Sequence, residues 1–111
     1  MQGFLQRSAI LGVFLCLILS SAAQSQTDSA KAFKTNCVLC HSANGSGDSA
    51  AGKALKAKDL RSEEVQKQAD AALVEVITKG KGKMPAFSTK LQPEDIKKMV
   101  AYVRELAKTK K

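Results

Sequence analysis

The stretch NCVLCH, residues 36–41, constrains this chain more than any other part of its sequence. It holds two of the three cysteines, Cys37 and Cys40, and His41 is the only histidine. Reactive side chains at this spacing are typical of four kinds of chemistry: a disulfide loop, a thiol redox pair, a metal clip or a haem attachment site. The rest of the chain has to decide between them.

The first 23 residues have the order of a secretory signal peptide. Arg7 gives a short basic start, the run from Ala9 to Leu19 is apolar throughout, and small residues follow it. We expect residues 1–23 to be removed and residues 24–111 to form one exported domain. The apolar run is too short to span a bilayer comfortably, so a retained membrane anchor is the weaker alternative. Cys16 lies inside this run and is expected to leave with it.

Length and charge limit the class of protein further. A chain of 111 residues supports one hydrophobic core, and four Phe, one Tyr and no Trp leave that core few aromatic rings. The net charge of +8 favours acidic partners. Nucleic acid is a poor candidate, because an exported domain does not meet it and no aromatic residues alternate with the basic ones to stack on bases.

We predict an all-α fold with three main helices. The first covers residues 28–40, the second has Asp70 as its N-cap and stops at Gly80, and the third starts with Pro93 at its first position. The stretch 41–52 contains three glycines and is predicted to be a loop. The apolar stripe of the third helix is predicted to comprise Ile96, Met99, Val100, Val103 and Leu106.

Two long irregular segments separate these helices. One follows His41, with a weakly signalled turn from Ser62, and the other is the stretch KGKGKMPAFSTKL. Loops of this length are unusual inside a compact domain unless they wrap something, and small domains often need an added staple. A flat macrocycle would supply the missing apolar contacts; the alternative is a loosely packed domain with mobile loops.

Ligand counting separates the four chemistries of the cysteine cluster. A structural zinc site needs four ligands, and only carboxylates are available to complete Cys37, Cys40 and His41. A thioredoxin-like pair follows a strand, and none is predicted before Asn36. A disulfide across so short a loop would constrain little and leave His41 without a role. The pattern favours haem attachment, with the two thiols added to the vinyl groups and the imidazole on the iron.

Iron held by one histidine has a second axial position, for which methionine is the remaining candidate. Met1 belongs to the predicted signal peptide, and Met99 lies on the apolar stripe of the last helix. Met84 lies in a loop between glycines and Pro85. Such a residue is ordinarily a hydrophobic plug, but next to a haem its loop can approach the second face of the ring. We predict Met84 as the ligand.

The motif CVLCH, a glycine-bearing loop, KGKMPAF and the segment PEDIKKMVAYVREL occur here in one order. In that order the chain resembles a class I c-type cytochrome over about residues 29–108, like the small monohaem carriers of bacterial respiratory and photosynthetic chains. The resemblance implies the cytochrome c fold, with three helices and loops wrapped around one covalent haem c. It places thioethers on Cys37 and Cys40, the proximal ligand on His41 and the distal ligand on Met84.

Other positions match or depart from this family. Phe33 stands where the family has an aromatic residue that packs on the last helix, at contact positions matched by Met99 and Tyr102. The family often has a proline after the haem histidine, whose carbonyl accepts the second hydrogen bond of the imidazole; no proline follows His41 here. Ser29 replaces a glycine of the first helix, and we expect a slight loosening of the helix crossing.

The resemblance implies a one-electron carrier and no enzyme. Filling both axial positions with His41 and Met84 leaves no site for substrate or oxygen, and the thioether raises the reduction potential. If Met84 does not bind stably, the alternative is a five-coordinate haem that senses small ligands or has weak peroxidase activity. A docked subunit of an oxidase or dehydrogenase is a further alternative.

Lysines surround Met84 in the sequence, namely Lys79, Lys81, Lys83 and Lys90. They form either a solvated loop or a basic rim that steers docking to acidic surfaces of redox donors and acceptors. We expect a monomer that is periplasmic or otherwise exported, without a stable membrane anchor. Candidates for contacts with the haem propionates are Lys53, Lys56, Lys58 and Arg61.

Overall fold

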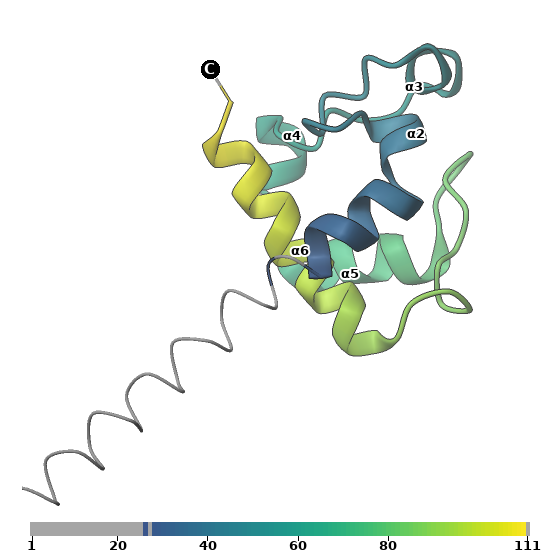
Figure 1. The fold of residues 1–111 in the computed structure, drawn as a ribbon, viewed down its shortest axis with the longest axis vertical. Coiled ribbons are helices and arrows are strands. Elements are labelled where there is room, and N and C mark those ends of the chain that lie inside the picture. The colour runs from purple at the N-terminus through teal and green to yellow at the C-terminus, as the bar shows by residue number, and fades with distance from the viewer. Residues whose placement is uncertain (1–25, 27, 111) are drawn as a thin grey trace, which may run out of the picture.

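The computed structural model describes residue 26 and residues 28–110, and it is built from helices (Figure 1). Helical residues 28–36 are followed by α2 (Val38–His41), α3 (Ala50–Leu55), α4 (Glu63–Gln66), α5 (Asp70–Lys79) and α6 (Pro93–Lys108). No strand occurs among the described residues; an isolated bridge joins Lys81 and Met84. The predicted all-α class is confirmed. The predicted signal peptide, including Cys16, lies outside the described residues.

Helix α6 follows its sequence signals closely. It begins at Pro93, as predicted, and carries Glu94 and Asp95 in its first turn and Lys108 in its last. These charges complement the helix dipole, and proline costs nothing at a position whose N–H has no helical partner. All five residues of the predicted apolar stripe are buried: Ile96, Met99, Val100, Val103 and Leu106.

The N-terminal helical segment, residues 28–36, packs on α6. Phe33 is 2% exposed and shares a core cluster with Met99 and Leu106. The ring of Phe33 lies 5.1 Å from that of Tyr102, centroid to centroid, in a tilted arrangement. The expected contact of this aromatic residue with the last helix is therefore confirmed, and it anchors the helix that leads into the cysteine cluster.

A second cluster of buried side chains, Val65, Leu73 and Val100, joins α4 and α5 to α6. Arg104 of α6 fastens the same junction: its guanidinium donates to the carbonyls of Gln66, at 2.8 Å, and Gln68, at 2.6 Å.

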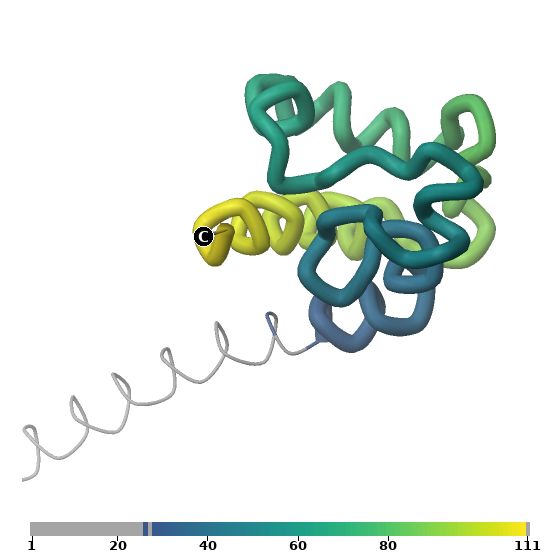
Figure 2. The backbone as a smooth tube through the Cα atoms, turned by 90° about the horizontal axis from the view of Figure 1, so that it is seen from above, coloured from purple at the N-terminus to yellow at the C-terminus, as the bar shows by residue number. Residues whose placement is uncertain are grey.

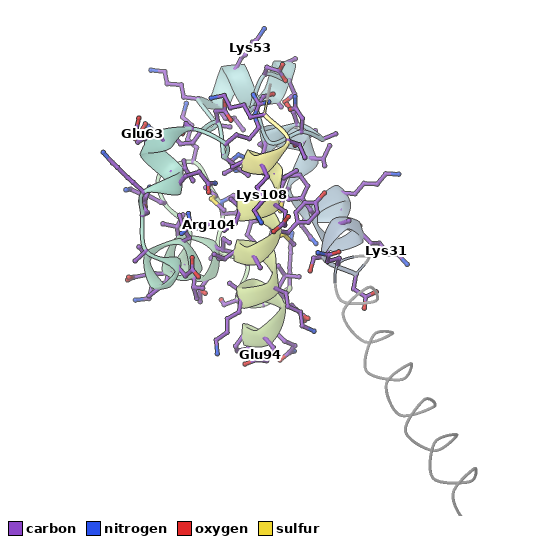
Figure 3. All side chains as sticks on the ribbon, turned by 90° about the vertical axis from the view of Figure 1, so that its left-hand side faces the viewer. Lys31, Lys53, Glu63, Glu94, Arg104 and Lys108 are labelled. Atoms are coloured by element: carbon purple, nitrogen blue, oxygen red, sulfur yellow. The ribbon has the colours of Figure 1, made fainter. Side chains whose placement is uncertain are left out.

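The start of α5 corrects one sequence-based prediction. Asp70 is the first residue of α5 and Ala69 is its N-cap, so the predicted capping role of Asp70 is wrong. Its carboxylate binds Arg104 instead, at 2.8 Å. Figure 3 shows Arg104 on the side of α6 that faces the α4–α5 junction.

Helix α3 corrects the prediction that residues 41–52 form a loop throughout. The loop ends at Ser49, whose Oγ accepts a hydrogen bond from the Gly52 amide at 3.0 Å and so caps the helix. Glycine at position 52 is a packing requirement: a Cβ atom there would overlap the carbonyl oxygen of Cys40. The glycine that indicates a loop in the sequence is what lets α3 approach α2.

The first predicted helix, over residues 28–40, is interrupted. A turn at Cys37 separates residues 28–36 from α2. The side chains of Thr35 and Asn36 donate to carbonyls four residues earlier, at 3.1 and 2.9 Å, and this competes with the regular helical pattern. Ser62 does cap a short helix, α4, by accepting a hydrogen bond from the Val65 amide at 3.3 Å.

The irregular segments run across and around these helices. Figure 2 shows the chain between α3 and α4 crossing the molecule from one to the other. In Figure 1, α2 and α3 lie above α5, and the hairpin that follows α5 rises along the same side of the molecule. Within the described part of the chain, no helix combines the length and apolarity needed to cross a membrane.

Candidate functional site

The turn at Cys37 and α2 bring three of the four predicted site residues together. The Cys37 amide donates to the Phe33 carbonyl at 2.8 Å, which continues the anchored N-terminal segment. The amides of Cys40 and His41 then donate back to the Cys37 carbonyl at 3.3 and 2.9 Å. Cys37, Cys40 and His41 therefore share one helical turn.

Both cysteines are free thiols and half-buried. Burial, helped by the nearby Cys40, raises the pKa of the Cys37 thiol to about 11. A thiol with such a pKa stays protonated at neutral pH, whereas redox-active cysteine pairs depend on a thiolate of lowered pKa. The environment of Cys37 therefore disfavours the thiol redox alternative.

His41 is oriented by a hydrogen bond that the sequence did not indicate. Its Nδ1 lies 3.1 Å from the main-chain carbonyl oxygen of Lys58. A carbonyl can only accept, so this contact requires the proton on Nδ1, and in the neutral imidazole the lone pair is then on Nε2. A metal-binding histidine ordinarily has this arrangement, with one ring nitrogen held by the protein and the other free to ligate.

Lys58 thus supplies the acceptor that the family usually takes from a proline after the histidine. Any residue can provide a main-chain carbonyl, so the residue type at position 58 carried no signal for it. The Lys58 side chain points to another partner, Glu64, with Nζ 3.0 Å from Oε1. Arg61, a propionate candidate, has its guanidinium bound to the carboxylate of Asp59 at 3.0 and 3.2 Å.

Met84, the fourth predicted site residue, lies in a tight hairpin after α5. Lys81 and Met84 exchange two main-chain hydrogen bonds, of 3.1 and 3.0 Å. The hairpin is tied to α5 because the amide of Phe87 donates to the Ile77 carbonyl at 3.0 Å, and the Phe87 side chain is buried. Met84 itself is half-buried, and its main chain is fixed by the bridge to Lys81.

Met99 has a different environment from Met84. It is 2% exposed and packs against Phe33 and Leu106 in the core. It serves as a core residue, which agrees with its position on the predicted stripe.

The donor set fits a covalently bound haem. Two thiols on one helical turn, an imidazole held through Nδ1, and a thioether on a separate fixed hairpin are the groups that such a macrocycle needs. The described residues contain no group of three or more His, Cys, Asp or Glu side chains placed to hold a metal ion by themselves.

Comparison with known proteins gives the family. Residues 24–103 match the family described as cytochrome c oxidase, cbb3-type, subunit III. The chain is also 38% identical over 97 residues to cytochrome c6 of Nostoc sp., an alignment that covers 85% of this chain and 85% of that protein. The chain belongs to the class I c-type cytochromes.

Two further relatives are a solved structure with a similar fold and a longer protein that matches this chain over part of its length. A solved structure titled KustC0563 c-type cytochrome has a TM-score of 0.65 and 31% identity, covering 70% of this chain and 95% of that one. The cbb3-type cytochrome c oxidase subunit FixP of Bradyrhizobium sp. is 40% identical over 69% of this chain but only 26% of its own length. This cytochrome carries one covalently attached haem c and is an electron carrier rather than an enzyme.

Proposed function

We propose that the protein is an exported one-electron carrier with a His41- and Met84-ligated haem c, attached through Cys37 and Cys40. The observation that carries this proposal is the 3.1 Å contact between His41 Nδ1 and the Lys58 carbonyl, which leaves Nε2 available on the turn that bears both thiols. When bound, haem c supplies an iron centre that gains and loses one electron.

The two axial residues account for a carrier. Hydrogen bonding to Lys58 raises the basicity of His41 and strengthens it as a ligand. The thioether of Met84 favours the reduced iron and raises the reduction potential. With both positions filled by the protein, substrate and oxygen have no open coordination site, which supports transfer between redox proteins over chemistry on a bound molecule.

A pair of matched variants tests the assignment of Met84. In the oxidised holoprotein, methionine ligation gives a weak charge-transfer band at the red end of the visible spectrum. We expect Met84→Leu to abolish this band and to let the reduced protein bind carbon monoxide. Met99→Leu keeps the volume of a core residue and should retain the band at a cost of about 1 kcal/mol or less in stability. Loss of the band in the Met99 variant alone would contradict the proposal.

Export is supported by the basic start and the apolar run of residues 9–19, followed by small residues. The mass of the holoprotein purified from the periplasm should correspond to a chain starting at residue 24. A mass that still includes residues 1–23 would instead indicate a retained N-terminal anchor.

The lysines of the hairpin support docking to acidic redox proteins. Lys81 and Lys83 are exposed on either side of Gly82, directly before Met84. A cation beside the ligand loop lies near the route by which an electron reaches the iron, and it attracts anionic partners over several ångströms.

A second candidate function is that of a docked subunit of a terminal oxidase. The match to the cbb3-type subunit family and to part of FixP favours it. Gel filtration of the native extract distinguishes the two functions. A free carrier elutes at the size of the single chain, and a subunit elutes with an oxidase complex.

A further inference from the structure

We propose that the Asp59–Arg61 ion pair is a positioning device that fixes the Lys58 carbonyl against His41 and thereby lowers the reduction potential of the haem. This inference rests on the proposed role of His41 as the iron ligand. Asp59 and Arg61 act on His41 through the main chain of residues 58–62.

The ion pair closes a compact turn directly after Lys58. The carboxylate of Asp59 accepts from the Arg61 amide at 2.9 Å and from the Arg61 guanidinium at 3.0 and 3.2 Å. The Asp59 carbonyl also accepts from the Ser62 amide at 3.1 Å. The side chains are only 31% and 18% exposed, so solvent screens this two-pronged pair less than an ordinary surface pair.

The other side of the turn is held by the body of the protein. The Leu60 amide donates to the Gly45 carbonyl at 2.8 Å, and the Leu60 carbonyl accepts from Gln66 Nε2 at 2.7 Å. The Leu60 side chain packs against both core clusters. The Lys58 carbonyl belongs to the peptide bond between Lys58 and Asp59. Asp59 is held in place because the next residue, Leu60, is anchored in the core.

Gly47 confines the Lys58 carbonyl from the loop that follows His41. A Cβ atom at position 47 would lie 3.1 Å from the Lys58 oxygen and 2.8 Å from the Ala57 oxygen. The Gly47 amide in turn donates to the His41 carbonyl at 2.8 Å. The loop and the turn are thus in close contact around one carbonyl oxygen, and glycine is the residue that permits it.

A carbonyl fixed in this way sets the electronic character of His41. A short hydrogen bond from Nδ1–H draws the proton away from the ring, gives the imidazole more anionic character and stabilises the oxidised iron. If the turn loosens, the hydrogen bond lengthens on average, and the oxidised state loses part of this stabilisation. Loosening should therefore raise the reduction potential.

Two variants of Asp59 separate positioning from charge. Asp59→Ala and Asp59→Asn remove the same negative charge, but asparagine keeps an oxygen that can accept from the Arg61 amide. A charge effect alone gives both variants the same potential. The positioning role predicts a larger rise for Asp59→Ala than for Asp59→Asn, measured by potentiometric titration of the holoproteins at one pH and ionic strength.

Arg61→Met provides the opposite change of charge. Removing a cation lowers a reduction potential by electrostatics, whereas loosening the turn raises it. We expect a rise, because methionine keeps the packing of the side-chain stem but ends the pairing with Asp59. An exposed ion pair on α6, Lys97 with Glu94, is the control: Lys97→Gln and Glu94→Gln should shift the potential little and in opposite directions.

Hydrogen exchange at His41 Nδ1 supplies a readout that does not depend on electron transfer. In the reduced, diamagnetic holoprotein, NMR should show this proton exchanging roughly fivefold faster in Asp59→Ala, which corresponds to weakening one hydrogen bond. Unchanged exchange, or equal potentials for the two Asp59 variants, overturns the inference. If the unaltered holoprotein does not show the spectrum of a histidine-ligated haem, the proposed function itself is refuted.

Discussion

At the scale of single residues, Asp59 couples the stability of the protein to pH. Hydrogen bonding from Arg61 holds the pKa of this carboxyl below its usual value, and Lys110 adds a smaller attraction in the same direction. Because the folded pKa is depressed, the stabilisation is complete above the pKa of an unfolded aspartate, about 3.9, and is lost as the pH falls through the lower folded value.

Acid unfolding of Asp59→Asn measures this contribution. Near neutral pH the unaltered holoprotein should be more stable than the variant, and the difference should shrink below about pH 4 and vanish once Asp59 is protonated. Circular dichroism in urea at a series of pH values gives both stabilities. A difference that stays constant down to the lowest pH would show that the pair does not contribute through its charge.

The residue that orients His41 shows where sequence reasoning ends. The roles predicted for Cys37, Cys40 and His41 depend on side-chain chemistry at a fixed local spacing, which a sequence displays directly. The acceptor for His41 is a main-chain oxygen 17 positions away. Every residue has such an oxygen, so only the folded path of the chain between α3 and α4 identifies Lys58.

At the scale of elements, the hairpin after α5 depends on two glycines with positive φ. Gly80 has φ of 75° and Gly82 has φ of 58°. They differ in their surroundings: a Cβ atom at Gly80 would lie 2.5 Å from the Met84 carbonyl oxygen, and one at Gly82 would have nothing within 4 Å. Position 82 therefore needs glycine only for its backbone conformation. Position 80 also needs glycine because there is no room for a Cβ atom.

Alanine at each glycine tests this difference. Gly82→Ala should cost about 1 kcal/mol, the price of a left-handed alanine, and keep the methionine charge-transfer band. Gly80→Ala should cost roughly 2–4 kcal/mol, because the overlap is added to the penalty for alanine at a φ of 75° and ψ of 171°, which essentially only glycine adopts, and it should weaken the band by displacing the Met84 main chain. Thermal unfolding and the visible spectrum measure both effects. A stronger effect on the band from position 82 would contradict this view of the hairpin.

The elements also differ in how far their own sequence determines them. Helix α6 has proline at its start, acids in its first turn and a regular apolar stripe, and all three signals lie within the helix. Helix α3 has weak local signals, and Gly52 argues against it locally. Its glycine is explained by the Cys40 carbonyl of another helix and the Gly47 carbonyl of the preceding loop, both of which a Cβ atom would overlap. The local sequence pattern therefore predicts α6, whereas the glycine in α3 makes sense only once the contact with another part of the chain is known.

At the scale of the whole molecule, the position of charge relative to the ligand hairpin determines how partners approach. Figure 1 shows the hairpin after α5 and the C-terminal end of α6 on opposite sides of the molecule. Lys83 is exposed on the hairpin, and Lys108 is exposed at the end of α6. Replacing either lysine by glutamine removes one positive charge, at two different distances from Met84, and Lys108 is also paired with Glu105 at 2.7 Å.

Electron transfer to small charged oxidants tests the docking role of the hairpin. Oxidation of the reduced holoprotein by hexacyanoferrate(III), an anion, should slow several-fold in Lys83→Gln at low ionic strength. It should change little in Lys108→Gln, because salt screening limits the range of electrostatic attraction to about 10 Å at 0.1 M salt. The rate for the unaltered protein should fall as salt is added, and the two variants should converge with it. With a cationic cobalt complex as the oxidant, Lys83→Gln should instead react faster than the unaltered protein, because the lysines of the hairpin repel a cation. If the two lysines prove equivalent for both oxidants, net charge rather than the ligand hairpin governs the encounter, and the acidic docking partner loses its support.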